Sequence, residues 1–286
     1  MKHLVLLLWL ALVIPARAEE PVTPLPGTAD TFRQLANILD ALQKHYIAPD
    51  QVRLNEHATL AFREFVRSLD PEADLLTPEQ FAAAKQPAPL PVASPIQVTN
   101  LAPGIAYCRL AEIMTAGTKE LRGQLLPGRK GHRLILDLRD NAGGSFDATL
   151  QYARLFLPAE SRIVALDFAR PEQRVGFVSD VTPKFSPPVA LLVNGGTSAE
   201  AEILAAALRD NGRAVLVGSR TAGHGLHYEI VALADGFGLK IPVSRYLPPS
   251  KRSFHGAGLT PDEIIDTSTV QKTDLALARA LEILKR

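Results

Sequence analysis

Apolar positions recur with two different spacings along the chain, and the change between them divides it into two parts. In the first part they follow the three-to-four-residue spacing of a helix, as at Phe32, Leu35, Leu39 and Leu42. Residues 55–69 repeat this spacing, which predicts a second helix. We therefore expect a small N-terminal helical module over residues 28–86.

From Gly104 onward, short apolar runs alternate with amphipathic segments. The runs predict strands over 133–138, 189–193 and 214–217, and the segments predict helices over 147–157, 198–208 and 274–285. Strand–helix–strand order implies parallel strands with right-handed crossovers. The segments 227–233 and 237–246 flank Asp235-Gly236 and predict a hairpin. This α/β order predicts buried central strands that contain Leu134, Ile135, Leu136, Leu191, Leu192, Val193, Leu216 and Val217.

The first 18 residues have the three parts of a secretory signal peptide. Lys2 and His3 precede an apolar run from Leu4 to Ile14, and Ala16-Arg17-Ala18 has the form of a cleavage site. The run is shorter than the roughly 20 residues that span a bilayer. We expect residues 1–18 to be removed, so that the protein is periplasmic or secreted and has no stable membrane span.

Charge and cysteine content exclude several functions. The 286 residues have a formal net charge of +1, without the clustered basic excess of nucleic-acid-binding proteins. Cys108 is the single cysteine, so no internal disulfide forms, and its apolar surroundings predict a buried residue. We expect no cofactor.

The proline-rich segment 87–97 predicts a stiff linker between the helical module and a core domain over 98–286.

Five segments, in order, resemble the tail-specific (C-terminal-processing) serine peptidases, peptidase family S41. They are Leu69–Phe81, Leu134–Gly144 (LILDLRDNAGG), Asn194–Ala214 (NGGTSAEAEILAAALRDNGRA), Val217–Gly225 (VGSRTAGHG) and Arg245–Asp262. The resemblance implies a crotonase-like α/β core that acts on polypeptide or peptide tails. Many members of the family carry a PDZ domain, and the linker 87–97 is too short to hold one.

The family's nucleophile segment has the pattern N-x-G-[ST]-A-S-A-x-E, with the catalytic serine three residues before the Glu. Here Glu202 is that Glu, so the nucleophile position holds Ala199 and Ser198 lies one residue earlier. One residue is a rotation of about 100° on a helix, which would turn the Ser198 hydroxyl away. Thr197 and Glu200 also have the spacing of a capping box, which predicts Ser198 as the first helical residue.

The same register places His224 where the family has its catalytic lysine. Histidine titrates near neutral pH and could replace it as base, although its side chain is shorter. A loop histidine without a catalytic role is the alternative. His224 and His227 also suggest a metal site, but the sequence offers no clear third ligand, and we expect no metal.

Two further features are candidates for support of the site. Gly143 and Gly144 follow a predicted strand, and such a turn can direct backbone N–H groups at a substrate carbonyl, although a tight turn alone also favours glycine. The resemblance implies a supporting role for Asp210, which could equally be a surface charge in a turn.

The sequence therefore leaves two hypotheses for the function. The first is a catalytically impaired or inactive peptide-binding homologue that keeps the cleft without the dyad. The second is an active serine-type endopeptidase that uses Ser198 with His224. The sequence leaves the oligomeric state open.

Overall fold

The computed structural model describes residues 27–48, 51, 53–86, 96–125, 133–183, 185–265 and 274–285. Its packing defines two compact units, and the boundary between them in the sequence lies between Phe62 and Arg63. The first unit contains α1 (Thr28–His45) and the start of α2 (Leu54–Leu69). Apolar side chains of both helices, including Leu35, Ile38 and Phe62, line a groove within this unit.

The second unit begins in α2 and continues through β1 (Asp74–Leu76) and α3 (Pro78–Ala84). Thr77 caps α3, since its hydroxyl accepts a hydrogen bond from the Gln80 N–H and its own N–H donates to the Gln80 side chain. The expected helical module over residues 28–86 is thus divided between the two units, and it contains a strand.

A six-stranded sheet is the centre of the second unit, in the order β11-β8-β7-β4-β3-β2. All neighbouring pairs are parallel except β2 with β3, which is antiparallel. Its strands are β2 (Ile96–Ala102), β3 (Ile105–Leu110), β4 (Arg133–Asp137), β7 (Val189–Val193), β8 (Ala214–Gly218) and β11 (Glu263–Ile264).

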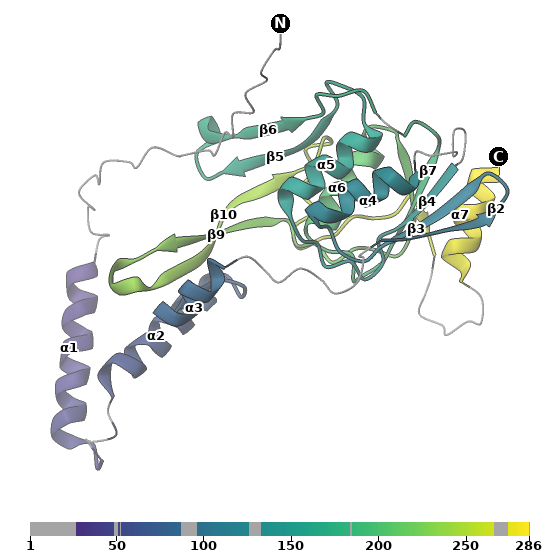
Figure 1. Ribbon diagram of the computed structural model, residues 1–286. Coiled ribbons are helices and arrows are strands. Elements are labelled where there is room, and N and C mark those ends of the chain that lie inside the picture. The colour runs from purple at the N-terminus through teal and green to yellow at the C-terminus, as the bar shows by residue number, and fades with distance from the viewer. Residues whose placement is uncertain are drawn as a thin grey trace, which may run out of the picture. The chain divides into compact units, whose positions relative to one another are not determined.

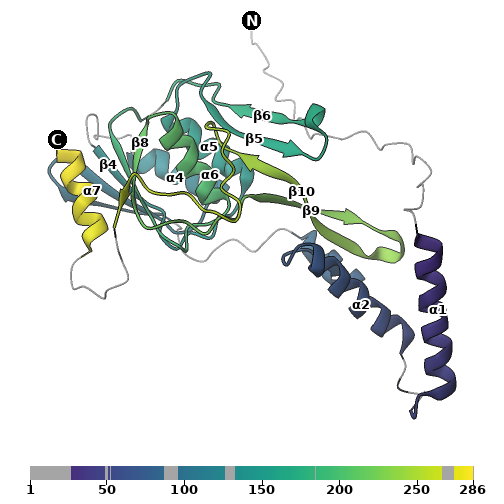
Figure 2. The same ribbon diagram turned by 180° about the vertical axis from the view of Figure 1, so that it is seen from behind.

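Helices cover both faces of this sheet (Figures 1 and 2). Those on one face are α4 (Thr115–Leu125), α5 (Phe146–Phe156) and α6 (Glu200–Asp210), and α7 (Leu275–Lys285) covers the other. Successive strand residues point to opposite faces, so Leu134 and Leu136 pack in the first core while Ile135 packs beside Ala280 of α7 in the second. All eight strand residues predicted to be central are fully buried, which confirms that prediction.

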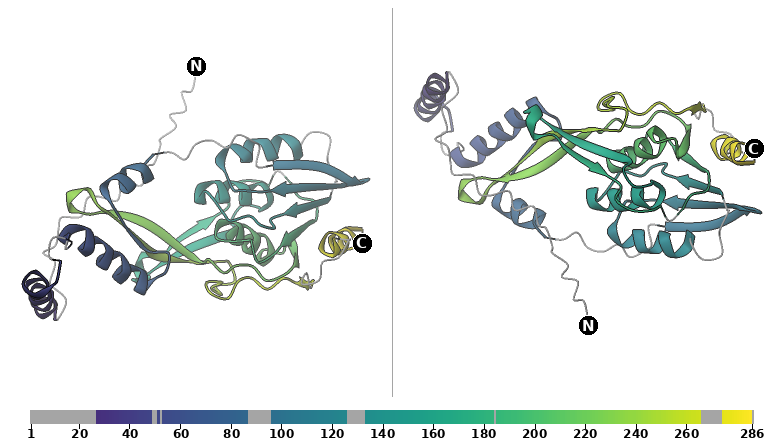
Figure 3. Two further views of the ribbon diagram at one scale, coloured as in Figure 1. Left: turned by 90° about the horizontal axis from the view of Figure 1, so that it is seen from below. Right: turned by 90° about the horizontal axis from the view of Figure 1, so that it is seen from above.

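A second sheet has the order β1-β10-β5-β6, and β9 pairs with β10. Figure 3 shows the ribbon from two further sides, with the long hairpin of β9 and β10 in green. Its longer strands are β5 (Arg162–Phe168), β6 (Val175–Val178), β9 (Leu226–Ala232) and β10 (Gly238–Leu247). Short 3-10 turns cover Pro171–Gln173 and Ala234–Gly236. The antiparallel pairing of β9 with β10 confirms the hairpin predicted around Asp235-Gly236.

Several elements differ from the sequence prediction. The helix expected over 198–208 begins two residues later, at Glu200, and α4, β2, β5 and β6 were not predicted. The expected signal peptide and residues 87–95 of the expected linker lie outside the described residues. Within the described residues, no helix combines the length and hydropathy that crossing a bilayer requires.

Candidate functional site

The site is built around a sharp turn between β7 and α6. Ala199 is the N-cap residue of α6 and has φ 47° and ψ −116°, a conformation that residues other than glycine rarely adopt. Its methyl group lies against the double-glycine turn, because a Cβ built on Gly143 would approach the Ala199 Cβ to 3.1 Å. The residue that the resemblance aligns with the family's serine is therefore an alanine, in a strained conformation and with its methyl group turned toward Gly143.

Buried Glu202 ties this turn to the segment that contains His224. One carboxylate oxygen accepts hydrogen bonds from the Thr221 hydroxyl and the Gly223 N–H, the latter at 2.8 Å. The other accepts from the N–H groups of His224 at 2.8 Å and Ala199 at 3.1 Å. Burial raises the pKa of Glu202, and these hydrogen bonds oppose the rise. Glu202 thus fixes the backbone of His224 relative to that of Ala199.

Backbone donors near Ala199 are occupied by side-chain oxygens. The Gly143 N–H donates to Asn141 Oδ1 at 2.9 Å, and the Gly144 N–H donates to Glu200 Oε2 at 3.1 Å. The Tyr246 hydroxyl donates to the other Glu200 oxygen at 3.2 Å. Burial, and then the nearby Glu200, raise the pKa of Tyr246, so its hydroxyl stays protonated and donates. A carboxylate therefore lies where the double-glycine turn would otherwise offer a donor to a substrate carbonyl.

Ser198 and His224 are in contact. Ser198 Oγ lies 2.7 Å from His224 Nδ1, and the ring's other nitrogen lies 3.7 Å from Glu72 Oε1. The serine is 7% exposed, whereas the His224 side chain is 57% exposed. The structure therefore brings together the two residues that the sequence singled out and adds a carboxylate, Glu72, that sequence reasoning missed.

The capping box predicted at Thr197 and Glu200 is wrong. The Thr197 hydroxyl donates to the Leu138 carbonyl at 2.8 Å and accepts from the Asn194 N–H at 3.0 Å. Glu200 bonds to Gly144 instead, and Ser198 precedes the helix. Thr197 cannot cap the helix because its hydroxyl is bound at the end of β4, before the chain turns into α6.

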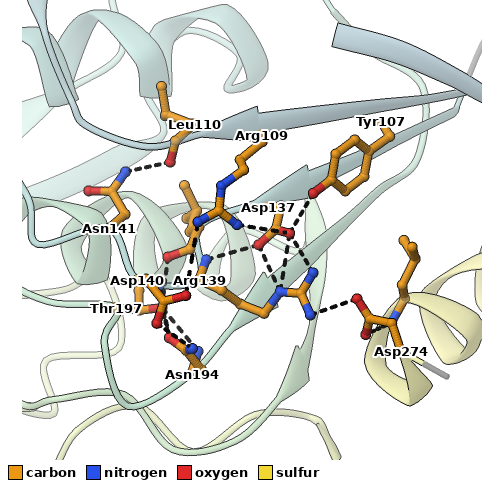
Figure 4. A network of polar contacts seen from close by, with 12 residues as sticks. Tyr107, Arg109, Leu110, Asp137, Arg139, Asp140, Asn141, Asn194, Thr197 and Asp274 are labelled. Atoms are coloured by element: carbon orange, nitrogen blue, oxygen red, sulfur yellow. Dashed lines mark hydrogen bonds and ion pairs between the residues drawn. The ribbon is translucent and has the colours of Figure 1, made fainter. Parts of the chain in front are cut away.

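A polar network beneath the turn holds the ends of β4 and β7 together (Figure 4). Asp137 is fully buried, accepts from Arg139 Nη2 at 2.6 Å, and accepts from the Tyr107 hydroxyl at 2.7 Å. Asn194 Nδ2 donates to Asp140 at 2.8 Å, which joins the loop after β7 to the loop after β4. The double-glycine turn is thus attached to the segment that carries Ala199.

The remaining candidates lie away from this contact. Asp210 ends α6, on the opposite end of the helix from Ala199, and accepts from the Ser250 N–H at 3.0 Å. Its side chain is 7% exposed and forms an ion pair with Arg209 at 3.0 Å, so Asp210 is not a free surface charge. Cys108 is fully buried, as predicted. Across the described part of the chain, no cluster of three His, Cys, Asp or Glu side chains could hold a metal ion.

The comparisons with known proteins agree with one another. The sequence model described as "Peptidase family S41" matches residues 104–265. A carboxyl-terminal-processing protease of Synechocystis sp. is 32% identical over 201 residues, which are 69% of this chain and 47% of that protein. The chloroplastic C-terminal processing peptidase of Tetradesmus obliquus is 30% identical over 272 residues, 91% of this chain and 55% of that protein. The chain spans about half the length of these relatives.

Solved structures show the same fold. The photosystem II D1 C-terminal processing protease aligns with a TM-score of 0.56 and 28% identity over 68% of this chain and 53% of that chain. A lipoprotein from Streptococcus agalactiae aligns with a TM-score of 0.61 over 93% of this chain and 99% of that chain, and its 16% identity supports the fold alone.

Fold and site together define a protein with a serine-peptidase core, in which a strand–turn–helix segment faces a double-glycine turn. The match to the family model covers more than half of the chain. The chain belongs to peptidase family S41.

Proposed function

We propose that this chain is an exported, peptide-binding member of family S41 in which peptide hydrolysis is impaired. The observation that carries the proposal is the pair of changes at the turn. Ala199 occupies the nucleophile position, and the Glu200 carboxylate accepts the hydrogen bond of the Gly144 N–H. The relatives named above are carboxyl-terminal-processing enzymes, which supports polypeptide tails as the bound class.

Both changes act against catalysis. Alanine has no nucleophilic atom, and a serine one residue away has its hydroxyl on His224 rather than at the double-glycine turn. Hydrolysis of an amide also needs donors aimed at the oxygen that becomes negative. A carboxylate on the Gly144 N–H puts a negative charge next to that oxygen, which raises the energy of the tetrahedral state.

A second candidate function is supported by one distance. Ser198 Oγ is 2.7 Å from His224 Nδ1, within reach for proton transfer, and Glu72 lies on the far side of the ring. In this alternative the chain is an active endopeptidase: Ser198 attacks the carbonyl, His224 accepts its proton, and Glu72 orients the imidazole.

One experiment separates the two candidates. The purified chain is incubated with fluorescently labelled unfolded casein, beside Ser198→Ala, His224→Ala and the exposed control Ser68→Ala. We expect the wild type to release no more fluorescence than Ser198→Ala, while the labelled casein still binds in anisotropy titrations. Cleavage by wild type and Ser68→Ala that both site variants lose would instead establish the Ser198–His224 endopeptidase.

The proposed export has its own test. Residues 1–18 have the organisation of a signal peptide, so the mature protein is expected to begin near Glu19. N-terminal sequencing of protein from fractionated cells would show Glu19 in the exported fraction. An intact Met1 in the cytoplasmic fraction would contradict export and leave the peptide-binding proposal standing.

A further inference from the structure

The second sheet carries a hollow on its outer face, away from the candidate site. Leu247 of β10, Ala165 of β5 and Gly176 of β6 lie side by side in the strand register. Val164 is 3% exposed and faces the core, so its neighbour Ala165 faces outward. Ala165 and Gly176 have small side chains, so the surface is recessed at this point. A Cβ built on Gly176 would meet no atom within 4 Å.

One wall of the hollow is a fixed turn. Pro248 and Pro249 line it, and the turn closes with a hydrogen bond from the Lys251 N–H to the Pro248 carbonyl at 2.8 Å. The Ser250 N–H donates to Asp210 at 3.0 Å, which attaches this turn to the end of α6. The wall is thus held in place before any ligand arrives.

The rim of the hollow is positively charged. The described lining contains three cations, Arg162, Arg174 and Lys251, and no carboxylate. Arg174 forms an ion pair with Asp167, at 2.5 Å between Nη2 and Oδ1. Arg162 and Lys251 form no ion pair among the described residues, and both are exposed residues of the lining. Their charge remains available to an anionic ligand.

We propose that this hollow binds the C-terminal residue of a polypeptide tail, with its carboxylate on Arg162 and Lys251 and its apolar side chain over Ala165 and Gly176. A chain terminus carries a carboxylate and a side chain on one Cα, which matches an apolar floor beside a cationic rim. The proposal rests on the proposed peptide binding and names a docking site on the core domain itself.

An edge strand beside the hollow can accept the rest of an extended tail. In the described part of the sheet, β6 pairs only with β5, so the outer backbone groups of Val175–Val178 have no strand partner. Extended peptides bind such edges through main-chain hydrogen bonds, while pockets beside the edge select side chains.

The hollow can be altered separately from the candidate site. Phe177 and Val164 also border the hollow, but both pack into the core on the other face of the sheet, where the Phe177 ring centroid lies 5.1 Å from that of Phe146. Phe146 in turn stacks on Tyr246, the residue that donates to Glu200. Substitutions at Gly176, Arg162 or Lys251 therefore leave the contacts around Ala199 in place.

The test compares two ten-residue peptides with an N-terminal fluorescein and the ending Ala-Leu, one with a free carboxylate and one amidated. Anisotropy titrations of the wild-type chain should show the free carboxylate binding about tenfold or more tightly, the effect of one charge-assisted contact. Arg162→Gln with Lys251→Gln should abolish the difference. Gly176→Leu should weaken both peptides by filling the hollow. Neutralisation of exposed Lys119 and Arg122, as Lys119→Gln with Arg122→Gln, is the matched control.

The outcomes separate this inference from the function on which it rests. Equal binding of both peptides, unchanged in the double variant, overturns the docking site while peptide binding stands. No binding of either peptide to wild type overturns both. A second copy of this chain is the other occupant to test, by sedimentation analysis of the oligomeric state. If the wild type is a dimer and Gly176→Leu dissociates it, the hollow holds a second copy and the proposal is wrong.

Discussion

The Glu200 carboxylate accepts a hydrogen bond from the Gly144 backbone N–H, at 3.1 Å between Oε2 and N. Residue 200 is the first residue of α6, so its side chain reaches across to the double-glycine turn directly beside Ala199. The family pattern has an alanine at this position. If Ala199 and His224 occupy the dyad positions, as proposed, restoring the dyad alone would leave a negative charge in the place where catalysis creates another.

The first prediction concerns a rebuilt enzyme. The triple variant Ala199→Ser, His224→Lys, Glu200→Ala should cleave labelled unfolded casein, because it restores a serine, a lysine base and a free Gly144 donor. The double variant that keeps Glu200 should be slower by about 10²-fold, the usual effect of losing one oxyanion donor. Initial rates of fluorescence release measure both.

A matched control for the rebuilt enzyme keeps everything except the nucleophile. The variant with His224→Lys and Glu200→Ala retains Ala199 and should show no activity above wild type. Equal rates for the triple variant and for Ala199→Ser with His224→Lys, which keeps Glu200, would show that the Glu200 carboxylate does not obstruct the site.

The second prediction concerns the stability of the site. Glu202→Gln places an NH2 group against N–H donors, since the carboxylate accepts from three backbone N–H groups and one hydroxyl. A buried donor without an acceptor costs about 1–3 kcal/mol. We expect the free energy of unfolding, from urea titrations followed by circular dichroism, to fall by about 2–4 kcal/mol. The exposed control Glu112→Gln should change it by less than about 0.5 kcal/mol.

The inner strands β4, β7 and β8 of the central sheet were predictable because they are buried on both faces and have nearly continuous apolar sequences. Val189–Val193 was predicted with its observed bounds for this reason. In contrast, β6 contains Gly176 and exposed Val175 and Val178, so its four residues carry no alternating pattern. The strand exists because β5 offers it an edge, and the sequence of β6 alone does not contain that information.

The candidate site was predicted in part. Comparison with the family pattern identified Ala199 and His224. The second hypothesis paired Ser198 with His224, and only the three-dimensional structure shows that the two side chains are in contact. The capping box at Thr197 failed because the Thr197 hydroxyl donates to the Leu138 carbonyl, and the helix begins two residues later, with Ala199 as N-cap and Glu202 accepting from its N–H. Glu72 was out of reach of sequence reasoning, since it lies 152 positions before His224 and approaches it only in three dimensions.

The third prediction concerns the core. Leu191 of β7 is fully buried in the core beneath α5 and α6. Leu191→Ala should lower the free energy of unfolding by about 2–5 kcal/mol, because it removes buried apolar surface and leaves a cavity. Ile264→Ala removes a similar volume from a side chain whose residue is 69% exposed, and should cost less than about 1 kcal/mol. Equal losses in urea denaturation would contradict the observed burial.

The last prediction concerns the ion pair beneath the double-glycine turn. Asp137 is fully buried and accepts from Arg139 and from Tyr107, so Asp137→Asn leaves the Arg139 guanidinium without its closest counter-charge. Breaking a buried pair on one side costs about 3–5 kcal/mol. Arg139 keeps a second partner, Asp274, at 2.8 Å, which places the expected loss near the lower end of that range.

A double-mutant cycle distinguishes this ion pair from general disruption of the fold. If the two side chains act as a pair, Asp137→Asn with Arg139→Gln should destabilise by less than the sum of the single variants, with a coupling of about 1–3 kcal/mol. The exposed pair Lys44–Asp40, at 2.8 Å on α1, is the control and should couple by less than about 0.5 kcal/mol. Additive losses of unfolding free energy at Asp137 and Arg139 would show that the two side chains stabilise the turn independently. Only for an interacting pair does the second substitution lower the free energy of unfolding by less once the first is present.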